Sequence, residues 1–239
     1  NDIRFYLSQI PSADSTILEI GCGTGRVTIP LSQKCKAILG IDISKSMIDI
    51  FNKKLIENRN TTGRVKAEIH DACEFRTDEK YDLIIAPFRV FQNIEDDESI
   101  SRFFDTIRYH LKNNGRCILN VFQPFAVDDL AVRTKWESTK DNKKMWEMDI
   151  QGVKIICYDK ISKIHPDKLI CYPTLTYEVV KDGRIIDKTE LNIAMRCYFP
   201  KQFIDIIEAN GFEIEDKWGG YLSEIYGEGS ELVVKFKKR

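Results

Sequence analysis

The hydrophobic positions in the first half of the chain form short apolar runs separated by longer amphipathic stretches. The apolar runs predict strands at residues 16–21, 37–42, 64–70, 81–86 and 115–123. Between them lie stretches with helical spacing, of which 44–57 and 96–111 are the clearest. The apolar stripe of the second helix consists of Ile100, Phe103, Phe104, Ile107 and Leu111. Alternating strands and helices predict a parallel, doubly wound sheet of the α/β class.

The alternation of strands and helices stops after the fifth strand, and the sequence of residues 136–196 predicts antiparallel strands. Asp182-Gly183 separates two apolar runs and is a strong signal for a two-residue hairpin turn, and His165-Pro166 marks a further turn. Apolar residues at 191, 193 and 195 alternate with other residues and predict one buried face. We therefore expect a β insertion here.

The helix–strand pattern returns near the end of the chain. Phe199-Pro200 opens a predicted helix that Gly211 ends, and strands are expected near 212–218 and 231–237. Three segments follow from this pattern: a core at 1–135, the β insertion at 136–196, and the rest of the core at 197–239.

Composition and charge narrow the class of protein. The chain has 239 residues, 43% of them hydrophobic and 31% charged, which is enough for one full core with an insertion. A net charge of −1 argues against a nucleic-acid partner. No apolar run reaches the length of a membrane span and no signal peptide is visible, so a cytoplasmic protein with no membrane partner is expected. Whether an N-terminal lid segment precedes residue 1 is left open.

Seven cysteines occur at scattered positions without any C-x-x-C motif. This spacing predicts neither a disulfide framework nor a metal site. Buried packing is the expected role of most of them.

The residues Ile17 to Arg26 run from an apolar strand directly into three alternate glycines, Gly21, Gly23 and Gly25. Glycines let the backbone turn sharply and approach a ligand, and the helix start that follows offers free N–H groups. The dinucleotide fingerprint is G-x-G-x-x-G, but here the third glycine comes one residue early and Arg26 takes the last position. This loop predicts a site for a nucleotide-like cofactor other than a dinucleotide.

Acidic residues lie at or near the ends of the first three predicted strands. Glu19 precedes the first glycine, and Asp42 and Asp71 end the second and third strands. Each glycine or acid could instead serve a tight turn, a strand end or a helix cap. Three acids at one sheet edge favour a cofactor site, because open α/β sheets bind ligands there.

These motifs resemble the class I S-adenosylmethionine-dependent methyltransferases, whose first motif is E/D-x-G-x-G-x-G. The resemblance implies a seven-stranded Rossmann-like sheet in the order 3-2-1-4-5-7-6 with the β insertion after strand 5. It implies that Asp42 binds the ribose hydroxyls and that Asp71 and Ala72 contact the adenine. The implied cofactor contacts are Glu19, Gly21, Cys22, Gly23, Thr24, Gly25, Arg26, Asp42, Ile43, Met47, Asp71, Ala72, Ala86 and Phe88.

The stretch after the fourth strand resembles a PFR-x-FQ-H/N-L motif of a subgroup of bacterial small-molecule methyltransferases. The methyl acceptor is therefore expected near Phe88, Arg89, Phe91 and Gln92, although a packed turn with a solvated arginine is the alternative. The subgroup also follows its fifth strand with D-V-F-N/H-P, where this chain has Asn120 in place of the acid. Phe122 and Gln123 are further candidates for the acceptor pocket.

The resemblance implies methyl transfer from S-adenosylmethionine to a nitrogen or oxygen atom of a small molecule. This chemistry needs no catalytic dyad, so the catalytic residue stays unassigned, with Tyr6, His165 and Arg196 as candidates. The alternatives are an NAD(P)-dependent oxidoreductase and a non-catalytic S-adenosylmethionine-binding regulator. The insertion is expected to form a lid on the substrate side or a dimer contact, in a monomer or homodimer.

Overall fold

The computed structural model describes residues 2–57, 64–123, 138–139 and 141–239. Contacts between residues divide the chain into two units, Asn1–Ala126 with Tyr198–Arg239, and Val127–Cys197. The division between 197 and 198 lies one residue from the expected boundary after 196. The expected boundary after 135 lies outside the described residues.

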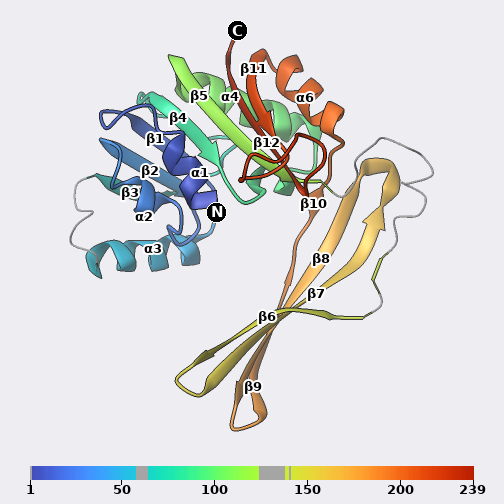
Figure 1. The fold of residues 1–239 in the computed structure, drawn as a ribbon. Coiled ribbons are helices and arrows are strands. Elements are labelled where there is room, and N and C mark those ends of the chain that lie inside the picture. Colours follow the sequence, from blue (N-terminus) through green and yellow to red (C-terminus); the bar gives the residue numbers. More distant parts are fainter. Residues whose placement is uncertain (1, 58–63, 124–137, 140) are drawn as a thin grey trace. The chain divides into compact units, whose positions relative to one another are not determined.

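The first unit contains a seven-stranded sheet in the order β11-β12-β5-β4-β1-β2-β3 (Figure 1). Its strands are β1 Thr16–Ile20, β2 Ala37–Asp42, β3 Val65–Ile69, β4 Tyr81–Ala86, β5 Leu111–Phe122, β11 Phe212–Trp218 and β12 Glu231–Lys238. β1 to β5 pair in parallel, and β12 runs antiparallel to both of its neighbours. This arrangement confirms the α/β class and the expected order, with β11 and β12 as the sixth and seventh core strands.

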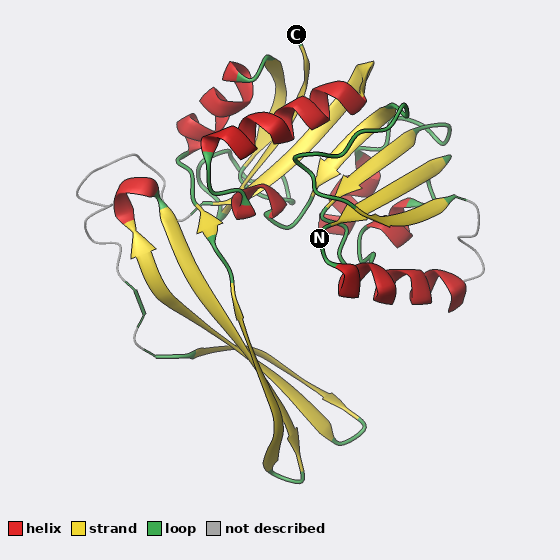
Figure 2. Cartoon of the chain, turned by 180° about the vertical axis from the view of Figure 1, so that it is seen from behind, coloured by secondary structure: helices red, strands yellow, loops and turns green. Residues whose placement is uncertain are grey.

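Helices cover both faces of this sheet (Figure 2). They are α1 Asp2–Ser8, α2 Thr28–Leu31, α3 Lys45–Glu57, the 3₁₀ helix η2 Val90–Asn93, α4 Asp97–His110 and α6 Pro200–Ala209. Successive strand residues point to opposite faces, so Ile17 of β1 packs with α1 to α3 and Leu18 with α4 and α6. Two apolar cores therefore hold the strand ends in place.

The helix α4 confirms the predicted apolar stripe. Ile100, Phe103, Phe104 and Ile107 are buried on it. Asp96 caps the helix, since its carboxylate accepts a 2.8 Å hydrogen bond from the Ser99 N–H. β5 begins at Leu111, four residues before the predicted start, because the chain passes from α4 directly into pairing with Tyr81 of β4.

The second unit is an antiparallel sheet. Its elements are β6 Lys143–Ile150, β7 Val153–His165, the 3₁₀ helix η3 Pro166–Lys168, β8 Ile170–Lys181, β9 Arg184–Asn192 and β10 Met195–Arg196. The order is β10-β8-β7-β6, and β9 also pairs with β8. Both predicted turns are confirmed: η3 follows His165, and Asp182 and Gly183 join β8 to β9 with φ values of 49° and 73°.

The predicted alternation at the end of β9 does not produce a buried face. Leu191 is 49% exposed, because β9 pairs with β8 alone and is an edge strand. Trp146, Met148 and Ile150 of β6 are exposed as well. Cross-strand pairing places Met148 opposite Ile155, and Ile155 opposite Val179, so apolar residues share one face of this sheet.

None of the helices in the described part of the chain combines the length and apolar character needed to cross a membrane.

Candidate active site

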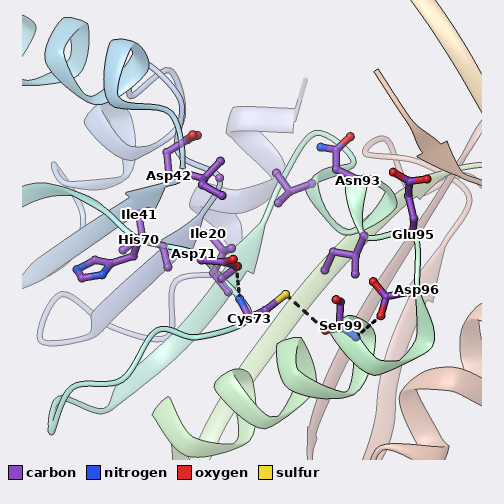
Figure 3. Close-up of a pocket in the computed structure, with 15 residues that line it drawn as sticks. Ile20, Ile41, Asp42, His70, Asp71, Cys73, Asn93, Glu95, Asp96 and Ser99 are labelled. Carbon is purple, nitrogen blue, oxygen red and sulfur yellow. Dashed lines mark hydrogen bonds between the residues drawn. The ribbon is translucent and has the colours of Figure 1, made fainter. Parts of the chain in front are cut away.

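A pocket of about 420 Å³ lies where β1, β2 and β3 end (Figure 3). Its walls include Gly21, Asp42, Ile43, Asp71, Ala72 and Val90. Asp42 and His70 stand at one end, and Glu95 and Asp96 stand at the other. The pocket has the size of a small-molecule site and the position that open α/β sheets use for ligands.

The glycine loop after β1 is fastened to Asp42. The Gly23 N–H donates to Asp42 Oδ2 at 2.8 Å, and the Ser44 N–H donates to Asp42 Oδ1 at 2.8 Å. Gly23 has a φ of 54°, and a Cβ there would meet no atom within 4 Å. Because a carboxylate oxygen accepts more than one hydrogen bond, Asp42 keeps capacity for a ligand hydroxyl in the pocket.

A second close approach joins the loop to the segment after β4. A Cβ at Gly21 would overlap the side chain of Val90, and the φ of Gly21 is 70°. Glycine is needed here both for the backbone conformation and for the space. Val90 therefore reaches the glycine loop and brings the turn after β4 to the pocket.

Glu19 supports the glycine loop from inside the protein. It is 2% exposed, and one of its carboxyl oxygens accepts a 2.6 Å hydrogen bond from the Thr28 hydroxyl at the start of α2. Burial raises the pKa of Glu19 to about 8, against opposing effects of the Thr28 hydrogen bond and of Arg26. Glu19 does not line the pocket, and its carboxyl group joins the end of β1 to the start of α2.

The other loop residues have partners within the first unit. Thr24 Oγ1 accepts a 2.9 Å hydrogen bond from Lys54 Nζ. Cys22 is 5% exposed and packs against Gly40, so its thiol belongs to the core and not to the pocket surface. Arg26 forms a 2.6 Å ion pair with Asp2 of α1. Cys22, Thr24 and Arg26 do not line the pocket.

The loop after β3 presents Asp71 and Ala72 to the pocket, and these are the residues for which the resemblance implies contacts with the adenine. Asp71 Oδ1 accepts a 2.8 Å hydrogen bond from the Cys73 N–H, which fixes the carboxylate in a tight turn. Ile43, which is 71% exposed, lines the pocket at the end of β2. Met47 is 43% exposed on α3 and does not line it.

Several pocket residues were not expected from the sequence: Cys73, Asn93, Ile94, Glu95, Asp96 and Ser99. They lie just after the predicted third strand, between the predicted acceptor stretch and the predicted helix at 96–111, or in the first turn of that helix. The rule that ligands bind at the carboxyl ends of strands could have indicated them, because both loops reach that edge.

The turn after β4 has an unusual backbone. Phe88 and Arg89 have φ values of 59° and 66°, which non-glycine residues seldom adopt. Phe88 is 73% exposed, and the Arg26 guanidinium lies 5.5 Å from the centre of its ring. Ala86, the last residue of β4, is fully buried and does not line the pocket. Two adjacent strained residues at a sheet edge are typical of functional sites.

Arg89 forms an ion pair with Glu231, the first residue of β12. Its Nε donates to Glu231 Oε1 at 3.0 Å, and its Nη2 donates to the same oxygen. Glu231 Oε2 accepts from Asn120 Nδ2 at 2.8 Å. The guanidinium also lies 4.8 Å from the centre of the Phe122 ring. Glu231 was not expected from the sequence, since no motif singles it out.

Two of the expected acceptor residues are structural. Phe91 is fully buried and contacts the rings of Phe103, Phe104, Tyr198 and Phe203. Gln92 is also fully buried, and its Oε1 accepts a 2.5 Å hydrogen bond from the Phe122 N–H. The 3₁₀ helix η2 turns both side chains into the core, so neither has exposed surface on the side where the acceptor was expected.

Gln123 joins the end of β5 to the loop before β12. Its N–H donates to the Ser230 carbonyl at 2.9 Å, and its Nε2 donates to the Gly227 carbonyl at 3.2 Å. The side chain is 7% exposed. Gln123 is therefore placed to shape the site, with little surface of its own to offer an acceptor.

The catalytic candidates are divided between the units. Tyr6 is fully buried in the first unit, where its ring centroid lies 5.8 Å from that of Tyr221. Burial raises the pKa of both phenols, so both remain protonated at neutral pH and neither is a ready base. His165 and Arg196 belong to the second unit. Among the described residues, no group of three or more His, Cys, Asp or Glu side chains could hold a metal ion.

Comparison with known proteins gives a consistent result. The methyltransferase domain family matches residues 17–115. The malonyl-[acyl-carrier protein] O-methyltransferase of Priestia megaterium is 26% identical over 218 residues, covering 81% of this chain and 75% of that protein.

Two solved structures share the fold over 99% of this chain. The CcbJ methyltransferase of Streptomyces caelestis has a TM-score of 0.77 at 16% identity, with 88% of its chain covered. The S-adenosylmethionine-bound amino pentose methyltransferase CalS10 of Micromonospora echinaspora has a TM-score of 0.73 at 13% identity, with 90% covered.

The order of the sheet, the glycine loop held by Asp42 and the family match agree with one another, and they set aside the dinucleotide-dependent oxidoreductase. The family match over residues 17–115 and the shared fold support a class I methyltransferase that uses S-adenosylmethionine.

Proposed function

We propose that this methyltransferase acts on a small molecule at a nitrogen or oxygen atom, and that the preferred acceptor is an amine. The preference for an amine rests on two ion pairs: Arg26 pairs with Asp2, and Arg89 pairs with Glu231. An acceptor that is itself a carboxylate needs a cation to bind it. Each arginine near the glycine loop and the β4 turn is matched by one carboxylate, so these four side chains together offer an acidic acceptor no excess positive charge.

The pocket suits the cofactor in three respects. Gly23 faces open space, Asp42 retains acceptor capacity for ribose hydroxyls, and Asp71 with Ala72 lies where an adenine would be held. When bound, S-adenosylmethionine supplies a methyl group on a positively charged sulfur, which needs no further activation. The protein has to hold the acceptor in line with the methyl group and exclude water. Phe88 and Phe122, at the ends of β4 and β5, are the residues we assign to the acceptor side.

Relatives support both kinds of acceptor atom. The name of the Priestia megaterium relative gives an oxygen of malonyl-acyl carrier protein as its target, whereas the solved CalS10 structure is that of an amino pentose methyltransferase. The O-methylation of an acidic acceptor is the second candidate, because that relative matches 81% of this chain. The paired arginines favour the amine.

The test begins with calorimetric titration of S-adenosylhomocysteine into the purified chain. Transfer from S-adenosylmethionine labelled in its methyl group is then measured on a panel of amino sugars, other amines, alcohols and malonyl thioesters. Turnover of amines alone supports the proposal, and turnover of malonyl thioesters alone supports the second candidate. Cofactor binding without turnover on any acceptor would instead favour a non-catalytic regulator.

The second unit remains a proposed lid on the substrate side or dimer contact. Exposed apolar side chains on one face of its sheet, such as Trp146 and Met148, support the dimer contact. Light scattering gives the molar mass of the wild type and of a Met148→Glu variant. A dimer that the substitution dissociates supports the contact, and a monomeric wild type supports the lid.

A further inference from the structure

We propose that Glu231 and the Phe122 ring form the subsite that binds the positively charged nitrogen of an amine acceptor, and that Arg89 fills this subsite until the acceptor replaces it. This inference rests on the proposed amine acceptor and assigns the residues that recognise it.

The surroundings of the Arg89 guanidinium have the chemistry of a cation site. A carboxylate oxygen of Glu231 lies 3.0 Å from Nε, and the Phe122 ring centre lies 4.8 Å from the guanidinium carbon. A carboxylate with an aromatic face is the combination that binds organic cations, because both present negative electrostatic potential. An ammonium group on the acceptor would satisfy the same two partners. The nitrogen would then give up a proton to water before it attacks the methyl carbon, because an ammonium nitrogen has no lone pair.

Glu231 is held more firmly than Arg89. The Glu231 side chain is 15% exposed, and its second oxygen accepts a 2.8 Å hydrogen bond from Asn120. It begins β12, where it pairs in register with Phe122 of β5. The neighbouring strands therefore fix both the carboxylate and the ring.

Arg89 is placed to leave. Its side chain is 37% exposed and extends from a turn in which both Phe88 and Arg89 have positive φ. A guanidinium released from Glu231 would enter water, where it stays well solvated. The exchange thus replaces one cation by another and leaves no partly buried carboxylate without a partner.

The Glu231 carboxylate also supplies the negative charge that the motif has at position 120, where this chain has an asparagine. The resembled motif has an acid at the end of the fifth strand, and this chain has Asn120 there. Asn120 Nδ2 donates to Glu231, and Asn120 Oδ1 accepts from the Arg89 N–H at 3.2 Å. The negative charge at this point of the sheet comes from β12 instead of β5.

The experiment compares Glu231→Gln, Arg89→Gln and a control, Glu215→Gln. Glu215 pairs with Arg116 across the same sheet at 2.7 Å and belongs to none of the assigned sites. The readouts are kcat and KM for the best amine found with the wild type, and the Kd of S-adenosylhomocysteine. A hydroxyl acceptor that the wild type methylates serves as the neutral comparison.

We expect Glu231→Gln to raise the KM for the amine by about tenfold or more with an unchanged Kd for S-adenosylhomocysteine, and Arg89→Gln to lower that KM. Loss of activity in both variants would mean that the ion pair only shapes the turn, and it would overturn the proposal. An unchanged KM in Glu231→Gln would overturn it too, while the amine activity of the wild type would stand. A wild type that methylates no amine refutes the proposed acceptor class itself, and the subsite with it.

Discussion

The N–H of Gly23 donates a 2.8 Å hydrogen bond to the carboxylate of Asp42, which joins the loop after β1 to the end of β2. The same carboxylate accepts from the N–H of Ser44. Asp42 therefore shapes the glycine loop before any ligand is present. The proposed contact of Asp42 with the ribose and its hydrogen bond to the glycine loop both contribute to the same cofactor site.

Replacing Asp42 by alanine is expected to weaken the binding of S-adenosylhomocysteine by about 1.5–3 kcal/mol, which is roughly a 10- to 150-fold increase in Kd. Calorimetry on the purified variant measures this change. Asp49→Ala is the matched control, because Asp49 pairs with Lys45 on the exposed side of α3. Equal affinity of the Asp42→Ala variant and the wild type would contradict both roles of this carboxylate.

The buried carboxyl of Glu19 is expected to make the free energy of unfolding depend on pH. Its pKa is about 8 in the folded chain, against an ordinary value of 4.5. Between these values the folded chain keeps a proton that the unfolded chain releases. The free energy of unfolding therefore falls as pH rises from about 4.5 to 8, by at most about 1.4 kcal/mol per pH unit from this group.

Glu19→Gln removes this titration and keeps an oxygen that accepts from the Thr28 hydroxyl. Urea unfolding of both proteins at pH 6, 7 and 8 gives the difference between their unfolding free energies, in which the other titrating groups cancel. We expect the variant to gain stability relative to the wild type as pH rises. Parallel curves would show that Glu19 does not change its charge in this range.

Much of the fold could be predicted from the sequence because periodicity and turn chemistry act locally. The stripe on α4, the Asp182-Gly183 turn and the glycine loop are each fixed by residues close together in the chain. The acids at the ends of β2 and β3 could be assigned to one edge, since parallel strands bring their carboxyl ends together.

The acceptor side could not be predicted in the same way, because it depends on contacts between distant segments. Arg89 and Glu231 are 142 residues apart, and they meet because β12 is inserted beside β5. The burial of Phe91 and Gln92 could not be predicted for a related reason: the 3₁₀ helix η2 rotates them into the core, and the motif gives no sign of that rotation.

Truncation of Phe91 is expected to lower the stability of the fold, whereas truncation of Phe88 is expected to affect acceptor binding. Phe91→Ala removes a fully buried ring from an aromatic core and should lower the free energy of unfolding by about 3–5 kcal/mol. Phe88→Ala removes a ring that is 73% exposed and should change it by less than about 0.5 kcal/mol, while raising the KM for the acceptor. Denaturant unfolding and steady-state kinetics test the pair. A stable Phe91→Ala variant with altered acceptor preference would restore Phe91 to the acceptor site.

Cys73 offers a direct measure of occupancy of the pocket, because it lines the pocket and is half-buried while the other six cysteines are buried. Burial and the nearby Asp71 carboxylate raise the pKa of its thiol to about 11, so alkylation is slow and is best followed near pH 9. Saturating S-adenosylhomocysteine is expected to slow labelling of Cys73 by about tenfold or more, since bound ligand blocks access to the thiol. Mass spectrometry identifies the modified residue, and a Cys73→Ser variant, which keeps the pocket but lacks the thiol, controls for labelling elsewhere. If calorimetry shows the ligand bound and Cys73 still reacts at its original rate, the cofactor occupies a different part of the molecule and the assignment of Asp42 and Asp71 fails with it.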